Sequence, residues 1–221
     1  MQLSDIKDRI PTDLFLALQK EGIVELRPSQ QKAIDAGLLE RKNLLVCTPT
    51  ASGKTLIAEL AGVKGIMEGT GKAVYVVPLV ALANEKFKEF DRKYKGLFKV
   101  VQTSSDVDAA DSFLSDYDFI VCTAEKLDSL LRHHSPWIRK VSTVIVDEIH
   151  LMNDVERGPT LEILLTMLRI LLPDVQIVAL SATIGNPDEL SSWLNAELVI
   201  DSWRPVVLKK GIYWDGKIEF T

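Results

Sequence analysis

Mostly apolar runs of four or five residues recur along the chain, and each is followed by small or polar residues. The runs lie at residues 43–47, 73–77, 98–102, 118–122, 143–146 and 176–180. Runs without regular polar alternation are typical of strands buried on both faces of a parallel sheet. Segments with helical spacing of apolar positions separate these runs. The pattern therefore predicts a three-layer α/β/α domain with a mainly parallel sheet, but it does not predict the order of the strands.

Helices are expected where a start signal precedes apolar positions at helical spacing. Thr12 is taken as the cap of the first helix and Gly22 as its stop, while Pro28 and Ser29 suit the start of the second. Because residues 159–172 are apolar nearly all round, they are predicted to form a core helix covered on most sides. Residues after 195 alternate like short strands. The expected helices span 13–20, 28–38, 56–61, residues from 78 onward, 106–114, 123–132, 159–172 and 186–195.

The loop at residues 48–55, with the sequence TPTASGKT, joins the first strand to a helix. A tight loop of small residues lets backbone N–H groups surround a phosphate, and the helix amino terminus adds partial positive charge. Lys54 is predicted to reach the outer phosphates, and the Thr55 hydroxyl to hold a magnesium ion. Thr48 departs from the usual pattern, which places a conformationally freer glycine there. The alternative is an ordinary strand-to-helix turn that contains Gly-Lys-Thr.

Gln30 lies at the start of the second expected helix, upstream of this loop. A glutamine amide offers both a donor and an acceptor, which is the pair needed to read the edge of adenine. Taken alone, Gln30 would be read as a solvated residue at a helix start. Its position before a phosphate-binding loop favours a contact with adenine.

Polar clusters follow the carboxyl ends of most of the predicted strands, where ligands bind in open α/β sheets. Asp147 and Glu148 come directly after the apolar run 143–146. Asp147 is predicted to be a second ligand of the magnesium ion, opposite Thr55. Glu148 is predicted to be the general base for the water that attacks the γ-phosphate. An isolated acidic pair is often a simple cap, but together with the loop it implies ATP hydrolysis by positioning and charge neutralisation.

Composition restricts the possible partners. The chain has 221 residues and a formal net charge of −5, so it lacks the basic profile of a protein that coats nucleic acid, and any such contact must be local. Cys47 and Cys122 lie in apolar runs without a Cys-x-x-Cys spacing and are predicted to be buried reduced thiols. The sequence shows no signal peptide and no apolar stretch that could cross a bilayer. We therefore expect a soluble cytoplasmic protein without a membrane partner.

Other functions compete with an ATP-driven motor. A GTPase would carry Asn-Lys-x-Asp and Asp-x-x-Gly, and neither string occurs. A small-molecule kinase would have no evident use for the Ser-Ala-Thr run at 181–183. A nucleotide-binding interaction module without a motor role stays open. No role is assigned to His133, His134 and Trp137, and the oligomeric state stays open, with a monomer as the expectation.

The motifs together resemble the first motor lobe of a DExH-box helicase of superfamily 2. The resemblance rests on residues 50–55, on Asp147-Glu148-Ile149-His150 and on Ser181-Ala182-Thr183. Further runs at residues 26–30, 78–82, 123–126, 157–162 and 203–206 resemble the superkiller-like group, and within it the archaeal DNA-repair helicases that act at stalled forks. The resemblance implies a RecA-like fold, with ATP and Mg²⁺ as cofactors and 3′-to-5′ translocation on single-stranded or forked DNA.

Carried over to this sequence, the resemblance implies a role for each matching residue. Lys54, Asp147 and Glu148 become catalytic, with Thr55 and Asp147 as ligands of the metal. His150 and the run Ser181, Ala182 and Thr183 would couple the nucleotide to the nucleic-acid groove. The ATP-binding residues are Gln30, Thr50, Ala51, Ser52, Gly53, Lys54 and Thr55, and those expected at a single strand are Pro78, Leu79, Ala81, Leu82, Thr123, Glu125 and Lys126. For the Pro78 segment, simple helix-start packing is an equal alternative.

Helicases of this kind have a second lobe, which supplies an arginine finger worth about 10³–10⁵ in rate. No Gln-x-x-Gly-Arg-x-Gly-Arg run occurs here. We therefore expect residues 1–202 to form the RecA-like first lobe and residues 203–221 to begin the connection to a missing second lobe. The expectation for this chain by itself is weak nucleotide binding and hardly any hydrolysis.

Overall fold

A computed structural model describes residues 1–104, 111–206, 209 and 211–220. Seven strands form one sheet in the order β3-β4-β2-β5-β6-β1-β7, and every neighbouring pair is parallel. The strands are β1 (Leu44–Cys47), β2 (Lys72–Val77), β3 (Val100–Thr103), β4 (Phe119–Thr123), β5 (Val141–Val146), β6 (Gln176–Ser181) and β7 (Glu197–Ile200). Two further strands, β8 (Gly211–Trp214) and β9 (Lys217–Phe220), form a separate exposed antiparallel hairpin.

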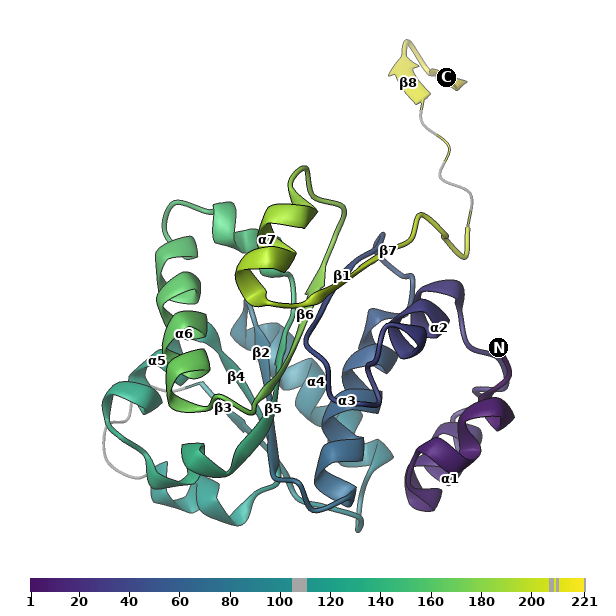
Figure 1. Ribbon diagram of the computed structural model, residues 1–221. Coiled ribbons are helices and arrows are strands. Elements are labelled where there is room, and N and C mark those ends of the chain that lie inside the picture. The colour runs from purple at the N-terminus through teal and green to yellow at the C-terminus, as the bar shows by residue number, and fades with distance from the viewer. Residues whose placement is uncertain (105–110, 207–208, 210, 221) are drawn as a thin grey trace.

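Helices cover both faces of the sheet (Figure 1). One side carries the 3₁₀-helix η1 (Leu3–Arg9) with α1 (Thr12–Lys20), α2 (Pro28–Asp35), α3 (Lys54–Met67) and α4 (Val80–Lys93). The other side carries α5 (Ala124–Arg132), α6 (Gly158–Leu171) and α7 (Pro187–Leu194), with the 3₁₀-helices η3 (Pro136–Lys140) and η4 (Ile149–Asn153). The 3₁₀-helix η2 (Asp111–Asp116) precedes β4.

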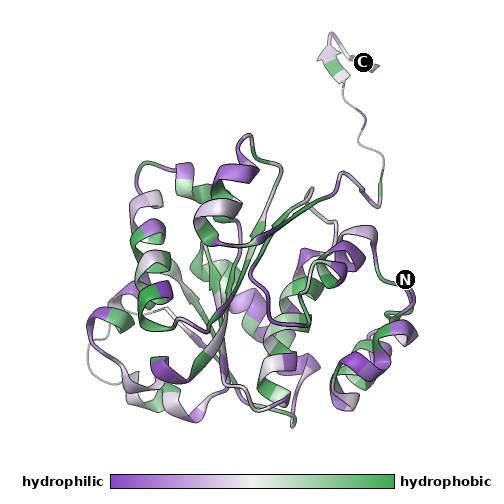
Figure 2. Cartoon of the chain, viewed as in Figure 1, coloured by the Kyte–Doolittle hydropathy of each residue, from purple (hydrophilic) through white to green (hydrophobic). Residues whose placement is uncertain are grey.

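Alternate strand residues enter two separate cores. Leu44 and Val46 of β1 pack with α1–α4, whereas Leu45 and Cys47 of the same strand pack with α5–α7. Both cores are therefore built from the same uninterrupted apolar runs, and Figure 2 shows hydrophobic residues along the strands and on the helix faces that meet them. This explains why the runs lack polar alternation, as a sheet covered on both faces requires. The predicted α/β/α architecture is confirmed, and Cys47 and Cys122 are buried and free.

Several boundaries differ from the expectations. Thr12 is the first residue of α1 and not its cap, because Pro11 holds the preceding extended conformation. The strand expected at 98–102 is β3 at 100–103, the second helix ends at Asp35, and α4 begins at Val80. Of the helix expected at 106–114, residues 106–110 lie outside the described residues, and the remainder belongs to the 3₁₀-helix η2.

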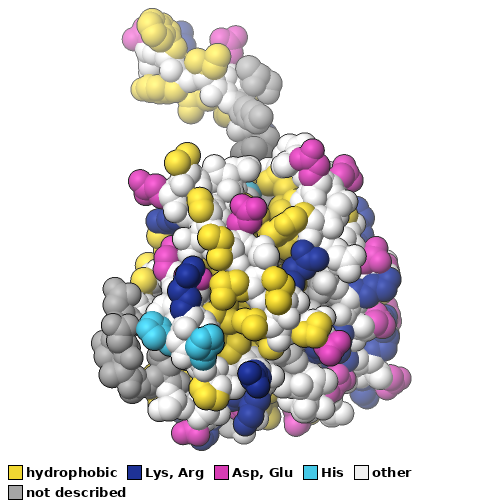
Figure 3. All heavy atoms as spheres, turned by 60° about the vertical axis from the view of Figure 1, so that its left-hand side comes forward, with side chains coloured by type: hydrophobic (Ala, Val, Ile, Leu, Met, Phe, Trp, Pro, Cys, Tyr) yellow, Lys and Arg dark blue, Asp and Glu magenta, His cyan; other side chains and the backbone are white. Residues whose placement is uncertain are grey.

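The expectation that residues 159–172 form a helix covered on most sides is wrong. α6 buries one face, through Leu161, Leu164, Leu165 and Leu168. Its other face stays open, since Ile163 is 47% exposed and Ile170 is 74% exposed. Figure 3 shows the side of the molecule on which α5 and α6 lie, with hydrophobic side chains in the middle of the surface. The helix therefore carries more apolar side chains than the described core buries.

No helix within the part of the chain that the structure describes combines the length and apolarity needed to span a membrane.

Candidate phosphate-binding site

The loop between β1 and α3 has the backbone shape of a phosphate cradle. Lys54 is the first residue of α3, and Gly53 before it has a left-handed φ of 95°. Ala51 also has a positive φ, of 62°, which is uncommon for a residue with a side chain. Strained backbone of this kind persists where the surrounding structure enforces it, and it gathers at functional sites. The left-handed Gly53 leads directly into the amino terminus of α3, where an anion is favoured.

Thr48, which stands where the usual pattern has glycine, needs no left-handed backbone, because it is not among the residues with positive φ. Its hydroxyl lies 2.8 Å from the Ser52 hydroxyl, in a fully buried contact across the loop. Its N–H donates to the carbonyl oxygen of Ser181 at 3.2 Å. The substitution therefore adds a hydrogen bond that closes the loop, and the backbone joins the loop to the 181–183 run.

Lys54 folds back over the loop. Its ammonium donates to the carbonyl oxygens of Thr48 at 2.9 Å and Pro49 at 3.2 Å. Burial lowers the pKa of Lys54, and the charges of Glu148 and Asp147 act in the opposite direction. A phosphate placed in the loop would add a further negative charge beside this ammonium and favour its charged form.

The acidic pair lies at the carboxyl end of β5, next to the loop. Asp147 accepts hydrogen bonds from the Tyr75 hydroxyl at 3.1 Å and from the Glu148 N–H at 3.0 Å. Glu148 has a left-handed φ of 50°, so its backbone is held in a strained conformation. Burial and the Asp147 charge raise the pKa of Tyr75 well above its ordinary value, which keeps this hydroxyl a donor to the carboxylate.

His150 approaches the second carboxylate of the pair. Its Nδ1 lies 3.2 Å from Glu148 Oε2. Within the described residues neither atom has a partner of hydrogen-bonding geometry, although both are buried. A buried carboxylate oxygen without a partner is costly unless something binds it. The two atoms face each other closely enough for a charge interaction when His150 is protonated.

The predicted metal ligands fit magnesium. Thr55 and Asp147 offer a hydroxyl and a carboxylate, which are the hard oxygen donors that Mg²⁺ takes, usually together with waters and substrate phosphates. The described residues contain no group of three or more His, Cys, Asp and Glu side chains that could hold a metal on their own. A contact that the sequence did not predict occupies Thr55, because the Lys86 ammonium donates to its Oγ1 at 3.1 Å.

Gln30, on α2, forms a hydrogen bond with the loop. Its Nε2 donates to the carbonyl oxygen of Gly53 at 3.0 Å, and its Oε1 accepts from the N–H of Arg27 at 2.8 Å. Arg27 Nη1 in turn donates to the Ala51 carbonyl oxygen at 2.6 Å. The Gln30 amide keeps one N–H and one oxygen lone pair beyond these bonds, and the residue is 4% exposed. A cavity of about 500 Å³ lies here, lined by Gln30, Gly53 and Thr55 together with residues of the α1–α2 connection and α4.

The other predicted residues occupy the same edge of the sheet. Ser181 ends β6 and is fully buried, Ala182 is half-buried and Thr183 is exposed. Pro78 follows β2, and Leu79 is exposed just before α4. At the end of β4, Thr123 caps α5 by accepting from the N–H of Lys126 at 3.4 Å. Ala81 and Glu125 are exposed, Leu82 is half-buried, and Thr123 and Lys126 are buried, so only part of the predicted strand-binding set presents its side chains.

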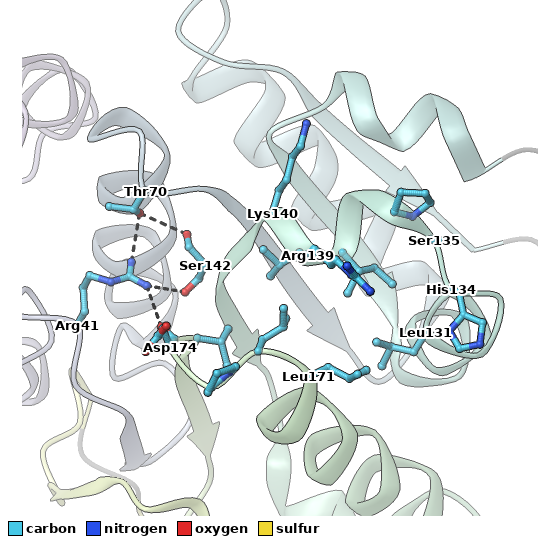
Figure 4. A pocket seen from close by; sticks show the side chains of 16 residues that line it. Arg41, Thr70, Leu131, His134, Ser135, Arg139, Lys140, Ser142, Leu171 and Asp174 are labelled. Atoms are coloured by element: carbon cyan, nitrogen blue, oxygen red, sulfur yellow. Dashed lines mark hydrogen bonds between the residues drawn. The ribbon is translucent and has the colours of Figure 1, made fainter.

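A larger cavity, of about 680 Å³, lies at the opposite end of the strands (Figure 4). It opens between the start of β5 and the ends of α5 and α6. Arg41 closes one side by donating to the carbonyl oxygen of Ser142 at 2.7 Å and to Thr70 Oγ1 at 3.2 Å. Cations are favoured at this end because the helix carboxyl termini of a parallel α/β fold gather there. None of the predicted site residues lines this cavity, so its size does not mark the phosphate site.

Sequence reasoning missed three residues that shape the site, namely Arg27, Tyr75 and Lys86. Each reaches the site from an element that is distant in sequence from its partner. Only Arg27 had a usable signal, because it belongs to the 26–30 run. Tyr75 sits inside an apolar run, and Lys86 is one of several lysines on α4, so neither stood out.

Replacing Gly53 with alanine is expected to remove nucleotide binding and to destabilise the fold by about 1–3 kcal/mol. A Cβ at this position would lie 2.4 Å from Gln30 Nε2 and 3.1 Å from Arg27 Cδ, in a backbone conformation that L side chains rarely adopt. Calorimetric titration with nucleotide and urea denaturation measure the two effects. Gly69→Ala is the matched control, because its φ of 71° is also left-handed but nothing lies within 4 Å of the added Cβ. Equal loss of nucleotide binding in both variants would refute the role of the Gln30 contact.

The parallel sheet, the cradle before α3 and the acidic pair at a neighbouring strand end define a phosphate-loop nucleotide-binding domain. The family model of the DEAD/DEAH box helicases matches residues 27–190, which include the loop, the acidic pair and the 181–183 run. The chain belongs to this family.

Curated relatives and solved structures agree with that assignment. The chain is 55% identical over 217 residues to an ATP-dependent DNA helicase Hel308 of Methanocaldococcus jannaschii, covering 94% of this chain and 18% of the relative. It is 54% identical over 200 residues to the Hel308 of Pyrococcus abyssi, covering 90% of this chain and 27% of the relative. The crystal structure of the DUF1998 helicase MrfA bound to DNA matches with a TM-score of 0.75 and 26% identity, over 88% of this chain and 30% of that one. The chain thus spans less than a third of the length of each.

Proposed function

We propose that this chain is the ATP-binding first motor lobe of an ATP-dependent DNA helicase that hydrolyses ATP together with a second lobe. Residues 1–202 would form the lobe, and residues 203–221 would begin the connection. The observation that carries the proposal is the convergence of Lys54, Thr55, Asp147 and Glu148, from two separate strand ends, on one edge of the sheet. The relatives named ATP-dependent DNA helicases support the motor, and two buried free cysteines suit a reducing cytoplasm.

Each side chain has a role in this proposal. The loop N–H groups and Lys54 would bind the phosphates, and Gln30 would read adenine with its remaining donor and acceptor. Thr55 and Asp147 would hold Mg²⁺, which neutralises charge on the phosphates. Glu148, whose Oε2 lies 3.2 Å from His150 Nδ1, would accept the proton of the attacking water. The hydrogen bond from Thr48 to Ser181 links the loop to the 181–183 run, through which nucleotide state would reach the DNA groove.

A single DNA strand is proposed to run across the strand ends beside α4 and α5. The exposed Leu79 and Ala81 and the amino termini of both helices would meet its backbone, which suits contacts that ignore base identity. Support comes from MrfA, for which two crystal structures contain DNA, one of them also AMPPNP. Residues Thr123 and Lys126 are buried, so their proposed contribution is to hold the start of α5.

Nucleotide binding by the chain itself is the first test. A fluorescent ATP derivative should bind and be displaced by ATP and ADP, but not by GTP at comparable concentration. Displacement by GTP with equal strength would contradict the adenine-reading role of Gln30.

Replacing Glu148 with glutamine is expected to lower DNA-stimulated ATPase activity at least about a hundredfold while leaving ATP affinity within about threefold, because general bases contribute 10²–10⁴ in rate. The measurement is steady-state ATPase in a protein of the relatives' full length. Glu156→Gln, at an exposed position outside the site, is the matched control. A nucleotide-binding scaffold without a motor role would show no change between the two variants.

The ATPase activity of the full-length protein is titrated with single-stranded DNA and with RNA at several salt concentrations. The polymer that stimulates the activity is the nucleic acid on which the protein acts. Contacts to phosphates predict stimulation that weakens steeply as salt rises. Stimulation by RNA alone would overturn DNA as the substrate.

A further inference from the structure

Lys86 makes an unexpected contact with the hydroxyl that is proposed to bind the metal. Its ammonium lies 3.1 Å from Thr55 Oγ1 and 2.9 Å from Glu89 Oε2. The Lys86 side chain is only 13% exposed, so the ammonium is held between these two oxygens with little access to water. Thr55 belongs to α3 and Lys86 to α4, so the contact joins the phosphate-binding helix to the helix that follows β2.

The same oxygen cannot serve two cations well. A hydroxyl oxygen has two lone pairs, and by donating to Thr55 Oγ1 the ammonium takes one of them, beside the position that a magnesium ion would occupy. Mg²⁺ on this oxygen would also lie within a few ångströms of the ammonium, where like charges repel strongly in a partly buried site. Either the ammonium leaves when the metal arrives, or the metal binds less tightly.

We propose that Lys86 is a positioning residue that holds the Thr55 hydroxyl in the metal-free state and competes with Mg²⁺ for it. This inference rests on the proposed function, because it assumes that Thr55 binds the metal of a nucleotide complex. When Mg²⁺ binds, the Lys86 ammonium withdraws to Glu89, its second partner. When nucleotide binds without metal, the ammonium stays and supplies positive charge beside the phosphates.

Lys86 lies on the helix that is proposed to contact the DNA strand, so DNA binding can influence the exchange of Lys86 for Mg²⁺ at Thr55. Leu82 lies four residues before Lys86 on the same helix, and the exposed residues proposed to meet the strand precede it. A helix is stiff over one turn, so a strand that presses on the amino end of α4 also acts on the ammonium that controls Thr55.

The competing explanation is that Lys86 only ties α3 to α4. A purely structural tie would affect stability, but it would leave the metal dependence of nucleotide binding unchanged. The informative quantity is therefore the ratio of the nucleotide dissociation constant in EDTA to that in saturating Mg²⁺.

The test compares Lys86→Met and Glu89→Gln with wild type, using a methylanthraniloyl derivative of AMPPNP as the fluorescent probe. Lys86→Met should raise the EDTA-to-Mg²⁺ ratio by about tenfold, since a positive charge beside the phosphates is lost without metal and one competitor is removed with metal. Glu89→Gln should lower the ratio, because it removes the partner to which Lys86 withdraws. Lys88→Met is the control, since it makes the same change at an exposed position of α4 and should leave the ratio at the wild-type value.

Opposite shifts in the Lys86 and Glu89 variants, with none in the Lys88 variant, support the inference. Equal ratios in wild type and the three variants overturn the inference about Lys86. The proposed function then still stands, provided that Lys54→Ala loses binding of the fluorescent nucleotide. Absence of probe binding in wild type overturns both. Thermal melting identifies loss of folding, and Glu89→Gln keeps the inference testable if Lys86→Met does not fold.

Discussion

Replacing Lys54 with alanine is expected to lower ATP affinity at least about a hundredfold, which corresponds to about 2.7 kcal/mol. Among the described residues, the ammonium donates to the carbonyl oxygens of Thr48 and Pro49. A charged phosphate is a better acceptor, because hydrogen bonds between ions contribute about 1.5–3 kcal/mol each. The alanine variant keeps the loop but loses the side chain that reaches the outer phosphates.

Isothermal titration with ATP and Mg²⁺ measures this loss. Lys64→Ala is the matched control, because Lys64 lies on the same helix and pairs with Glu68 at 2.7 Å, outside the loop. Its affinity should equal that of wild type. A change of less than threefold in Lys54→Ala would contradict the assignment of residues 48–55 as a phosphate-binding loop.

Replacing Lys93 with methionine is expected to destabilise the fold by about 3–5 kcal/mol, because it leaves a buried charge without its partner. Lys93 Nζ lies 2.6 Å from Glu59 Oε2, and the two side chains are 6% and 3% exposed. This pair joins α3 to α4, and both residues line the cavity beside Gln30. The Tyr94 hydroxyl, at 3.4 Å from the same oxygen, is too distant to replace the lost ion pair.

Urea denaturation at several pH values tests this prediction. Burial raises the pKa of Glu59, and removing Lys93 removes the attraction that opposes this rise. A raised pKa in the folded state means that the folded protein holds the proton more tightly than the unfolded chain. The loss of unfolding free energy in Lys93→Met should therefore be smallest below about pH 4.3, the ordinary pKa of glutamate. It should grow as the pH rises from there through the raised pKa of Glu59 in the folded state.

Two comparisons separate this effect from a loss of helix packing. Lys88→Met, at an exposed position of α4, should change stability by less than about 0.5 kcal/mol. The double variant Glu59→Met with Lys93→Met should recover most of the loss, since replacing both members of a buried pair with apolar residues is often neutral. If the double variant were no more stable than Lys93→Met alone, the unpaired carboxylate would not be the cause.

The position of the candidate site was predictable where it rests on local sequence. Residues 48–55 carry their own turn, their own helix start and the side chains proposed to act on a phosphate, so the eight residues are informative without their surroundings. Asp147 and Glu148 were predictable because they follow an uninterrupted apolar run, and in a parallel sheet such positions gather at one edge. The same reasoning failed for the covering of α6, because composition does not tell whether a neighbour exists to bury Ile163 and Ile170.

The contacts that hold these pieces together were not predictable. Arg27, Tyr75 and Lys86 each meet a partner between 24 and 72 positions away in the chain. Thr48 was read as a departure from the pattern, yet its hydroxyl bonds to Ser52 and its N–H to Ser181. Such pairings depend on which strands become neighbours, and no local pattern contains that information.

The residue pattern alone was therefore enough for the class of fold, the phosphate loop, the acidic pair and the family, because each depends on periodicity or on a short run with its own geometry. Strand order, the strained backbone of Glu148 and the ammonium on Thr55 came only from the folded chain. The physical reason is that alternating burial and turn shape are set within a few residues. The meeting of side chains from α3, β2, α4 and the segment after β5 is instead set by how seven strands assemble.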